Sequence, residues 1–168
     1  MENRNIFAIV GYIPLSFQDF EKAIFSAEFW ERVSPVSKIS ASFPNPNVLE
    51  ADVEDAIQVD PAGIAKIPLE IHGELVFEYK GEDGSKGHLY EVYARNNNYL
   101  NSLEARLRVK PEGARLKVGI FLQSLELNSM LFQRGLGKDA VVIALKLKME
   151  KLLRNFKTLA EQGKIFEE

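Results

Sequence analysis

Three side chains, Asp55, His72 and Tyr90, combine an ionisable group with a place in a segment of alternating apolar and polar residues. A carboxyl, an imidazole or a phenol can give or take a proton during catalysis. Spacing along the chain places no two of them together, so the sequence predicts no catalytic residues. An enzyme that uses one of them as its acid or base is one hypothesis for this chain.

Asp55 has the same parity as Val53 and Ile57, which predicts that its carboxylate faces inward with them. An unpaired carboxylate inside a protein is costly. Two interpretations follow. Asp55 is a polar anchor or an acid inside a pocket, or a bulge or bend in the strand turns it to solvent.

His72 and Tyr90 have simpler structural explanations. His72 shares the outward side of its predicted strand with Glu70 and Glu74, which favours a solvated charged face over a general base. Tyr90 is predicted to face inward. Its hydroxyl either meets a ligand, or the ring fills the core while the hydroxyl reaches water or a backbone carbonyl.

The chain has no cysteine and only two histidines. Disulfides, cysteine-ligated iron–sulfur clusters and thiolate catalysis are therefore excluded, and a histidine-rich metal site is not expected. Four acidic residues near predicted turns and edges lack the spacing of a calcium-binding loop; they are Asp52, Glu54, Glu82 and Asp83. We expect neither a metal nor a cofactor.

Composition and charge limit the partners. A net charge of -3 at pH 7 and a pI near 5.6 give no electrostatic reason to expect nucleic acid or an anionic membrane. The apolar run Ile6–Ile13 is too short to span a membrane and lacks the layout of a secretion signal. We therefore expect no nucleic-acid partner, no stable membrane insertion and a cytoplasmic location.

The 168 residues, 46% of them hydrophobic, have the size of one domain with a sizeable core, so residues 1–168 are predicted to form a single domain. Serines at 16 and 26 can cap two short helices that end near Phe25 and Ser34. Around them, alternation and turn residues predict seven strands: Ile6–Ile13, Val36–Phe43, Leu49–Val59, Leu69–Lys80, His88–Arg95, Asn101–Val109 and Ala114–Leu125.

The last third of the chain predicts one long amphipathic helix. An apolar stripe recurs at steps of three and four: Val141, Leu145, Met149, Leu152, Phe156 and Leu159. Asn128 and Ser129 can begin the helix and Gly163 can end it, which gives roughly 35 residues and about 50 Å. Gly135 and Gly137 predict a bend or a later start, with a joint near Leu136.

This order of elements, together with the segment GYIPLSFQDFEKAIFSAEFWERVSPVSKIS and its Trp30 before the second strand, resembles the START-like superfamily, also called helix-grip or SRPBCC. That superfamily includes the birch-pollen allergen, lipid-transfer and polyketide cyclase branches. The resemblance implies an α+β fold in which a curved seven-stranded antiparallel sheet wraps around the long helix, with an apolar cavity between them. The chain departs from the allergen branch at 44–47, where PNPN replaces a glycine-rich loop, and it carries no recognisable cyclase catalytic set.

The implied cavity predicts a binding or carrier protein for a hydrophobic or amphipathic small molecule. The alternatives are a cyclase- or hydrolase-like enzyme that uses the same cavity, and a protein-interaction module whose cavity is filled by its own side chains. Alternation and the helix stripe select the residues expected to line the cavity: Ile39, Phe43, Val53, Asp55, Ile71, Leu75, Phe77, Tyr90, Val92, Leu107, Leu116, Ile120, Leu122, Val141, Leu145 and Met149.

A second apolar ridge lies on the opposite side of the predicted helix: Phe132, Leu136, Ile143 and Leu147. One sheet cannot easily cover both sides of a helix. Either the early helical segment or the loop 81–87 folds over the ridge, or the ridge packs against its copy in a two-fold homodimer.

Overall fold

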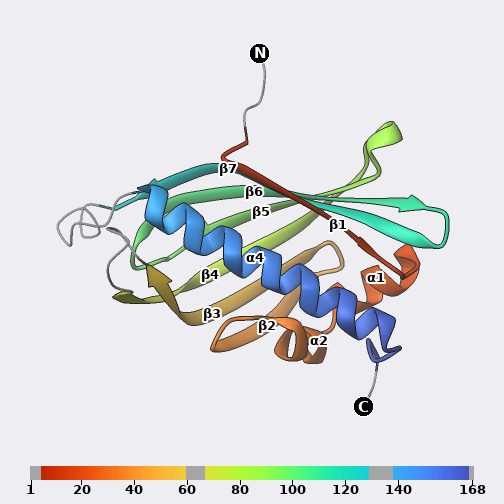
Figure 1. Ribbon diagram of the computed structural model, residues 1–168, viewed down its shortest axis with the longest axis horizontal. Helices are drawn as coiled ribbons and strands as arrows, with labels where there is room; N and C mark the ends of the chain where they lie inside the picture. Colours follow the sequence, from red (N-terminus) through yellow and green to blue (C-terminus); the bar gives the residue numbers. More distant parts are fainter. Residues whose placement is uncertain (1–4, 60–66, 129–137, 167–168) are drawn as a thin grey trace.

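The computed structural model describes residues 5–59, 67–128 and 138–166. Within them, one long helix lies across the hollow of a curved sheet (Figure 1). The elements in chain order are β1 Phe7–Ile13, α1 Phe17–Ile24, α2 Ala27–Val33, β2 Lys38–Asn45, β3 Val48–Val59, β4 Ile67–Glu82, the 3-10 turn η1 Gly84–Lys86, β5 His88–Arg95, β6 Leu100–Glu112, β7 Arg115–Leu127 and α4 Lys138–Glu161.

The seven strands form one antiparallel sheet in the order β1-β7-β6-β5-β4-β3-β2. The register places inward residues side by side: Phe77 lies opposite Leu49 on one neighbouring strand and opposite Val92 on the other. Register shifts interrupt β2, β4 and β6, and such bulges bend and twist a strand. The predicted α+β architecture, with a curved seven-stranded sheet around a long C-terminal helix, is confirmed.

The two short helices begin where their serines predict. The Ser16 hydroxyl accepts a hydrogen bond from the Asp19 N–H at 3.2 Å, and the Ser26 hydroxyl accepts one from the Phe29 N–H at 3.4 Å. Each serine satisfies one of the backbone donors that a helix start leaves unpaired. The Trp30 indole N–H donates to the Ile24 carbonyl at 2.7 Å, which joins α2 to the end of α1.

The sequence ends the second strand at Phe43 and predicts a turn over Pro44–Asn47; the first half of that turn is wrong, because Pro44 and Asn45 belong to β2 and Asn45 pairs with Val48. The β6–β7 hairpin likewise extends past Pro111 to Glu112. A proline at a strand end loses little, because there its missing N–H is rarely needed by a neighbour.

The described part of α4 runs from Lys138 to Glu161, and Gly163 follows it with a φ of 68°, which suits a glycine stop. Asn128 donates its N–H to the Tyr99 carbonyl at 2.9 Å, at the end of the sheet. The predicted start at Ser129 and the joint near Leu136 lie outside the described residues.

The inner side of β1 lets α4 approach closely. A Cβ atom at Gly11 would lie 2.6 Å from the Leu153 Cδ2 atom of α4, a separation that real side chains do not adopt. The helix therefore packs tightly on the β1 side. On the opposite side it is held by polar bonds: the Asn155 side-chain amide donates to the Val33 carbonyl at 3.0 Å.

Candidate functional site: an apolar pocket under the C-terminal helix

A pocket of about 220 Å³ lies between the concave face of the sheet and α4, and most of its lining is apolar. It is larger than the roughly 150 Å³ engineered cavity that accepts benzene in another protein. The short helices, the sheet and α4 all contribute to its wall: Trp30 comes from α2, Phe77 from β4 and Leu152 from α4.

Most residues predicted for the cavity border this pocket: Ile39, Val53, Asp55, Ile71, Leu75, Phe77, Val92, Leu107, Ile120, Leu122, Leu145 and Met149. Their contact with a ligand stays a prediction. Tyr90, Leu116 and Val141 are buried in the core and do not border the pocket. Phe43 is 38% exposed on the edge strand β2, where the register breaks beside it and its ring packs against Phe25.

Asp55 is only 9% exposed and faces the pocket, so the alternative in which the strand turns it to solvent is wrong. Its Oδ1 atom accepts hydrogen bonds from the Ser37 N–H at 3.2 Å and from the Ser37 hydroxyl at 3.1 Å. Its Oδ2 atom lies 3.1 Å from the Nζ atom of Lys148 on α4. Lys148 also donates to the Pro35 carbonyl at 3.0 Å, so the ion pair connects the helix to β3 and to the segment before β2.

The two oxygen atoms of this carboxylate are not equivalent. Oδ1 receives two directed hydrogen bonds, whereas buried Oδ2 receives none from the described residues. The Lys148–Asp55 contact at 3.1 Å is therefore an ion pair whose attraction comes from charge and proximity, and its geometry is not that of a hydrogen bond. The charge of buried Oδ2 is therefore balanced by Lys148.

Sequence reasoning missed Lys148, because a lysine on an amphipathic helix is normally placed in solvent. The available signal was its spacing: Lys148 lies three residues after Leu145 and four before Leu152, on the face that covers the pocket. Ser37 carried no such signal: the sequence places it inside the predicted strand Val36–Phe43, whereas β2 begins one residue later, at Lys38.

Tyr90 fills the core, in agreement with the structural interpretation. Its ring packs against Phe20 and Tyr79 at centroid distances of 6.3 and 5.0 Å. The hydroxyl is buried without a hydrogen-bond partner among the described residues, so the expected contact with a backbone carbonyl is absent. Burial, followed by the charges of Glu21 and Tyr79, raises the pKa of Tyr90 well above its ordinary value.

The other predicted acid–base candidate lies elsewhere. His72 is exposed on the outer face of β4, as the solvated interpretation predicts, and its backbone N–H donates to the Asn98 side-chain oxygen at 3.1 Å. Asp55, His72 and Tyr90 thus occupy the pocket wall, the outer surface and the core. The structure does not bring them together.

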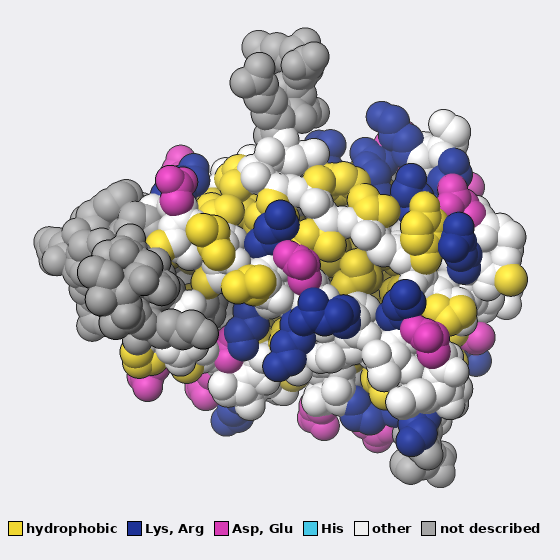
Figure 2. Space-filling model, in the orientation of Figure 1, with side chains coloured by type: hydrophobic (Ala, Val, Ile, Leu, Met, Phe, Trp, Pro, Cys, Tyr) yellow, Lys and Arg dark blue, Asp and Glu magenta, His cyan; other side chains and the backbone are white. Residues whose placement is uncertain are grey.

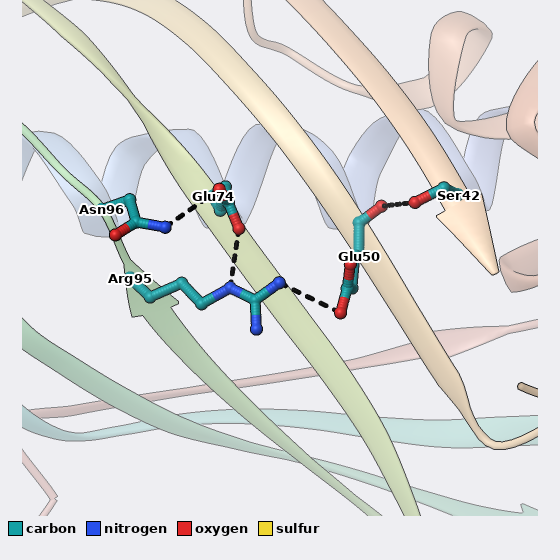
Figure 3. A network of polar contacts seen from close by, with 5 residues as sticks. All are labelled: Ser42, Glu50, Glu74, Arg95 and Asn96. Atoms are coloured by element: carbon teal, nitrogen blue, oxygen red, sulfur yellow. Dashed lines mark hydrogen bonds and ion pairs between the residues drawn. The ribbon is translucent and has the colours of Figure 1, made fainter. Parts of the chain in front are cut away.

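On the outer face of the sheet, Arg95 joins three strands (Figure 3). Its Nε atom donates to Glu74 at 2.6 Å, and its Nη2 atom lies 3.0 Å from Glu50. The Asn96 amide donates to the other Glu74 oxygen at 3.0 Å. The hydrogen bonds from Arg95 and then Asn96 hold the pKa of Glu74 below its ordinary value. Although Glu74 borders the pocket, its carboxylate is paired with Arg95 and Asn96 on the outer face of the sheet.

Among the described residues, no group of three or more histidine or acidic side chains is arranged to hold a metal ion. Asp83, one of the acidic residues considered for calcium, pairs with Arg108 at 2.9 Å. In the same part of the chain, no helix has the length and apolar character needed to cross a membrane.

The ridge proposed as a dimer interface is described only in part. Ile143 and Leu147 on α4 are each 61% exposed. Phe132 and Leu136 lie outside the described residues. A homodimer through this ridge therefore stays a prediction.

No family model and no curated protein sequence matches the chain. Solved structures do match it. TTHA0849 from Thermus thermophilus superimposes with a TM-score of 0.70 and 15% identity, over 93% of this chain and 97% of that chain. The Zhui aromatase/cyclase from Streptomyces sp. R1128 gives 0.62 with 9% identity, over 93% of each chain. A START superfamily protein from Mycobacterium smegmatis gives 0.57 with 14% identity, over 93% of this chain and 97% of that one. At these identities the likeness concerns the fold alone, and it shows that this chain has the START-like, or helix-grip, fold.

Proposed function

We propose that the chain binds a hydrophobic or amphipathic small molecule in the pocket between the sheet and α4. The observation that carries the proposal is the pocket itself, about 220 Å³ with an almost wholly apolar lining. Binding removes apolar surface from water, which is favourable by about 25 cal/mol per Å². A predominantly apolar pocket with a few polar groups is the usual form of a small-molecule site.

The enzyme alternative has one supporting observation, the convergence of Asp55 and Lys148 at the pocket. A solved protein of this fold is described as an aromatase/cyclase. Binding without chemistry is nevertheless better supported, because Tyr90 and His72 lie away from the pocket and Asp55 is already occupied by Ser37 and Lys148. The interaction-module alternative is less well supported, since the side chains leave open volume between sheet and helix.

Native mass spectrometry of gently purified protein tests the proposal. A retained apolar molecule, or saturable binding of the neutral fluorescent probe N-phenylnaphthylamine, is the expected result. Ala105→Phe adds a ring to the pocket wall and should weaken probe binding at least about tenfold. Ala8→Phe, on the exposed outer face of β1, is the matched control and should leave probe binding unchanged.

Two results would contradict the proposal. One is the absence of both a retained molecule and saturable probe binding. The other is equal probe affinity in wild-type protein and Ala105→Phe, because a ring added at the wall must compete with anything that occupies the pocket.

A further inference from the structure

The outer face of the sheet is basic where β6 and β7 lie side by side (Figure 1). Five basic side chains occupy alternate positions of these two strands: Arg106, Arg108, Lys110, Arg115 and Lys117. Their neighbours Leu107, Leu116 and Val118 face the pocket or the core, so strand alternation directs the five to the outer face. Among the described residues, Arg108 pairs with Asp83 at 2.9 Å and the other four have no ion pair.

These basic side chains surround a small apolar surface. Val10 on β1 is 50% exposed, and the register places it beside Gly119, which in turn lies beside Arg108. A Cβ atom at Gly119 would lie 2.7 Å from the Cε2 and Cζ atoms of Phe121. Because a Cβ atom projects from the face of a sheet, the half-buried Phe121 ring lies over this glycine. One side of the ring rests on the backbone and the other side is turned outward.

A second ring lies at the other end of this surface. The Cζ atom of Arg115 lies 3.9 Å from the centre of the Tyr12 ring, which is a cation–π contact. Tyr12 is beside Lys117, and Lys117 is beside Lys110. Aromatic rings and positive charges are therefore interleaved over three neighbouring strands. Proteins that bind single-stranded nucleic acid combine the same two features.

A single strand is the anionic partner that fits both features. Its phosphates are attracted to the basic side chains, and its bases are free to stack on an aromatic ring whatever their sequence. The bases of a duplex are stacked on one another, so a duplex could use the charges but not Phe121. An anionic membrane could also use the charges, but a ring that lies along the sheet cannot insert into it.

We propose that the outer face of β1, β7 and β6 binds a single strand of nucleic acid, with its phosphates at the basic side chains and one base stacked on Phe121. The net charge of -3 gave no reason to expect this partner, because a sum over the chain does not show that five basic side chains share one face. This site goes beyond the proposed function, since the pocket lies on the inner face of the sheet.

Fluorescence anisotropy of a labelled ten-nucleotide oligothymidylate, in 50 mM and in 200 mM sodium chloride, tests the proposal. Binding should be saturable at the lower salt concentration. Phosphate contacts by the four unpaired basic side chains predict that affinity falls roughly fiftyfold between the two concentrations. An abasic strand with the same number of phosphates should bind at least about fivefold more weakly, because it has no base to stack on Phe121.

Variants assign the site to this face. Lys110→Glu with Lys117→Glu should weaken binding at least about tenfold. Lys151→Glu with Lys157→Glu is the matched control, because it makes the same change of charge at exposed positions of α4. It should keep the affinity within about twofold. Phe121→Leu should weaken binding at least about fivefold without changing the salt dependence, since it removes a ring and no charge.

Three results would overturn the inference: no saturable binding of the oligothymidylate in 50 mM salt, equal affinity for the abasic strand, or equal losses in the two lysine pairs. Binding to vesicles of phosphatidylserine and phosphatidylcholine, without binding to the oligothymidylate, would also reject it and assign the face to a membrane. Circular dichroism checks that each variant is folded. The abasic comparison uses wild-type protein, so it remains decisive if Phe121→Leu does not fold.

Discussion

The hydroxyl group of Tyr90 leads to a prediction in which removing a polar group stabilises the protein. Tyr90→Phe deletes one oxygen atom from a side chain that is 1% exposed. That oxygen has no hydrogen-bond partner among the described residues. A buried polar group without a partner costs about 1–3 kcal/mol relative to water. We therefore expect the substitution to raise the free energy of unfolding by about 1–2 kcal/mol, allowing for the small void that it leaves.

Tyr79 provides the matched control, because it is the neighbouring tyrosine and its hydroxyl is paired. That hydroxyl lies 2.7 Å from the Nδ1 atom of His88. Tyr79→Phe should lower the free energy of unfolding by about 0.5–1.5 kcal/mol, the usual net value of a hydrogen bond. The same chemical change is thus expected to have opposite signs at two adjacent sites.

Alkaline pH gives a second measurement of the same group. Burial, with smaller contributions from Glu21 and Tyr79, raises the pKa of Tyr90 in the folded state. The free energy of unfolding therefore keeps its neutral-pH value below the unfolded-state pKa of about 10 and falls as pH rises from there through the folded-state pKa, by about 1.4 kcal/mol per pH unit. Tyr90→Phe removes this loss, so its stability should fall less steeply above pH 10 than that of the wild type.

Urea unfolding followed by circular dichroism, at neutral pH and at two values above pH 10, measures both effects. A Tyr90→Phe variant that is less stable than wild type by more than about 1 kcal/mol at neutral pH would refute the reasoning. It would mean that the hydroxyl has a partner in solution, such as a buried water.

Three further predictions concern the helix and its surroundings. Phe156→Ala should lower the free energy of unfolding by about 3–5 kcal/mol, because its buried ring packs against the aromatic core; a loss below about 1 kcal/mol in urea unfolding would contradict this. Gly11→Val should destabilise by about 1–3 kcal/mol by forcing Leu153 aside, and unchanged stability in the same assay would show that the helix can move away without cost. Light scattering should give a dimer mass for wild-type protein and a monomer mass for Ile143→Glu with Leu147→Lys; a monomeric wild type at high concentration would reject the dimer.

The helices and strands could be predicted well from the sequence, because the residues that indicate each of them lie within or next to it. Serines at helix starts, alternation within strands and glycines at turns identify β5 to the residue and both short helices. Strand ends were less predictable. Pro44 and Pro111 suggest turns by themselves, but pairing with the adjacent strand extends β2 and β6 through them.

The site was predictable only on its apolar side. Inward parity selects pocket residues such as Leu75 and Leu107, because alternation carries the direction of a side chain. Parity alone cannot separate pocket lining from packed core, as Tyr90 illustrates. The ion pair was not predictable, since Asp55 and Lys148 lie far apart in sequence and meet only when α4 covers the sheet.

Because α4 covers the inner face of the sheet, the side chains on its outward side and those on the outer face of the sheet form two different surfaces of the molecule. Basic side chains gather on the face that carries α4 (Figure 2), and the exposed ones on this helix include Lys146, Lys151, Arg154 and Lys157. The outer face of β3 and β4 carries exposed acidic side chains, among them Asp52, Glu54 and Glu70. The net charge of -3 is therefore unevenly distributed over the molecule, with exposed basic side chains along α4 and exposed acidic ones on the outer face of β3 and β4. Below about 0.1 M salt, where fields extend roughly 10 Å or more, we expect it to be retained by cation-exchange as well as anion-exchange resins near neutral pH.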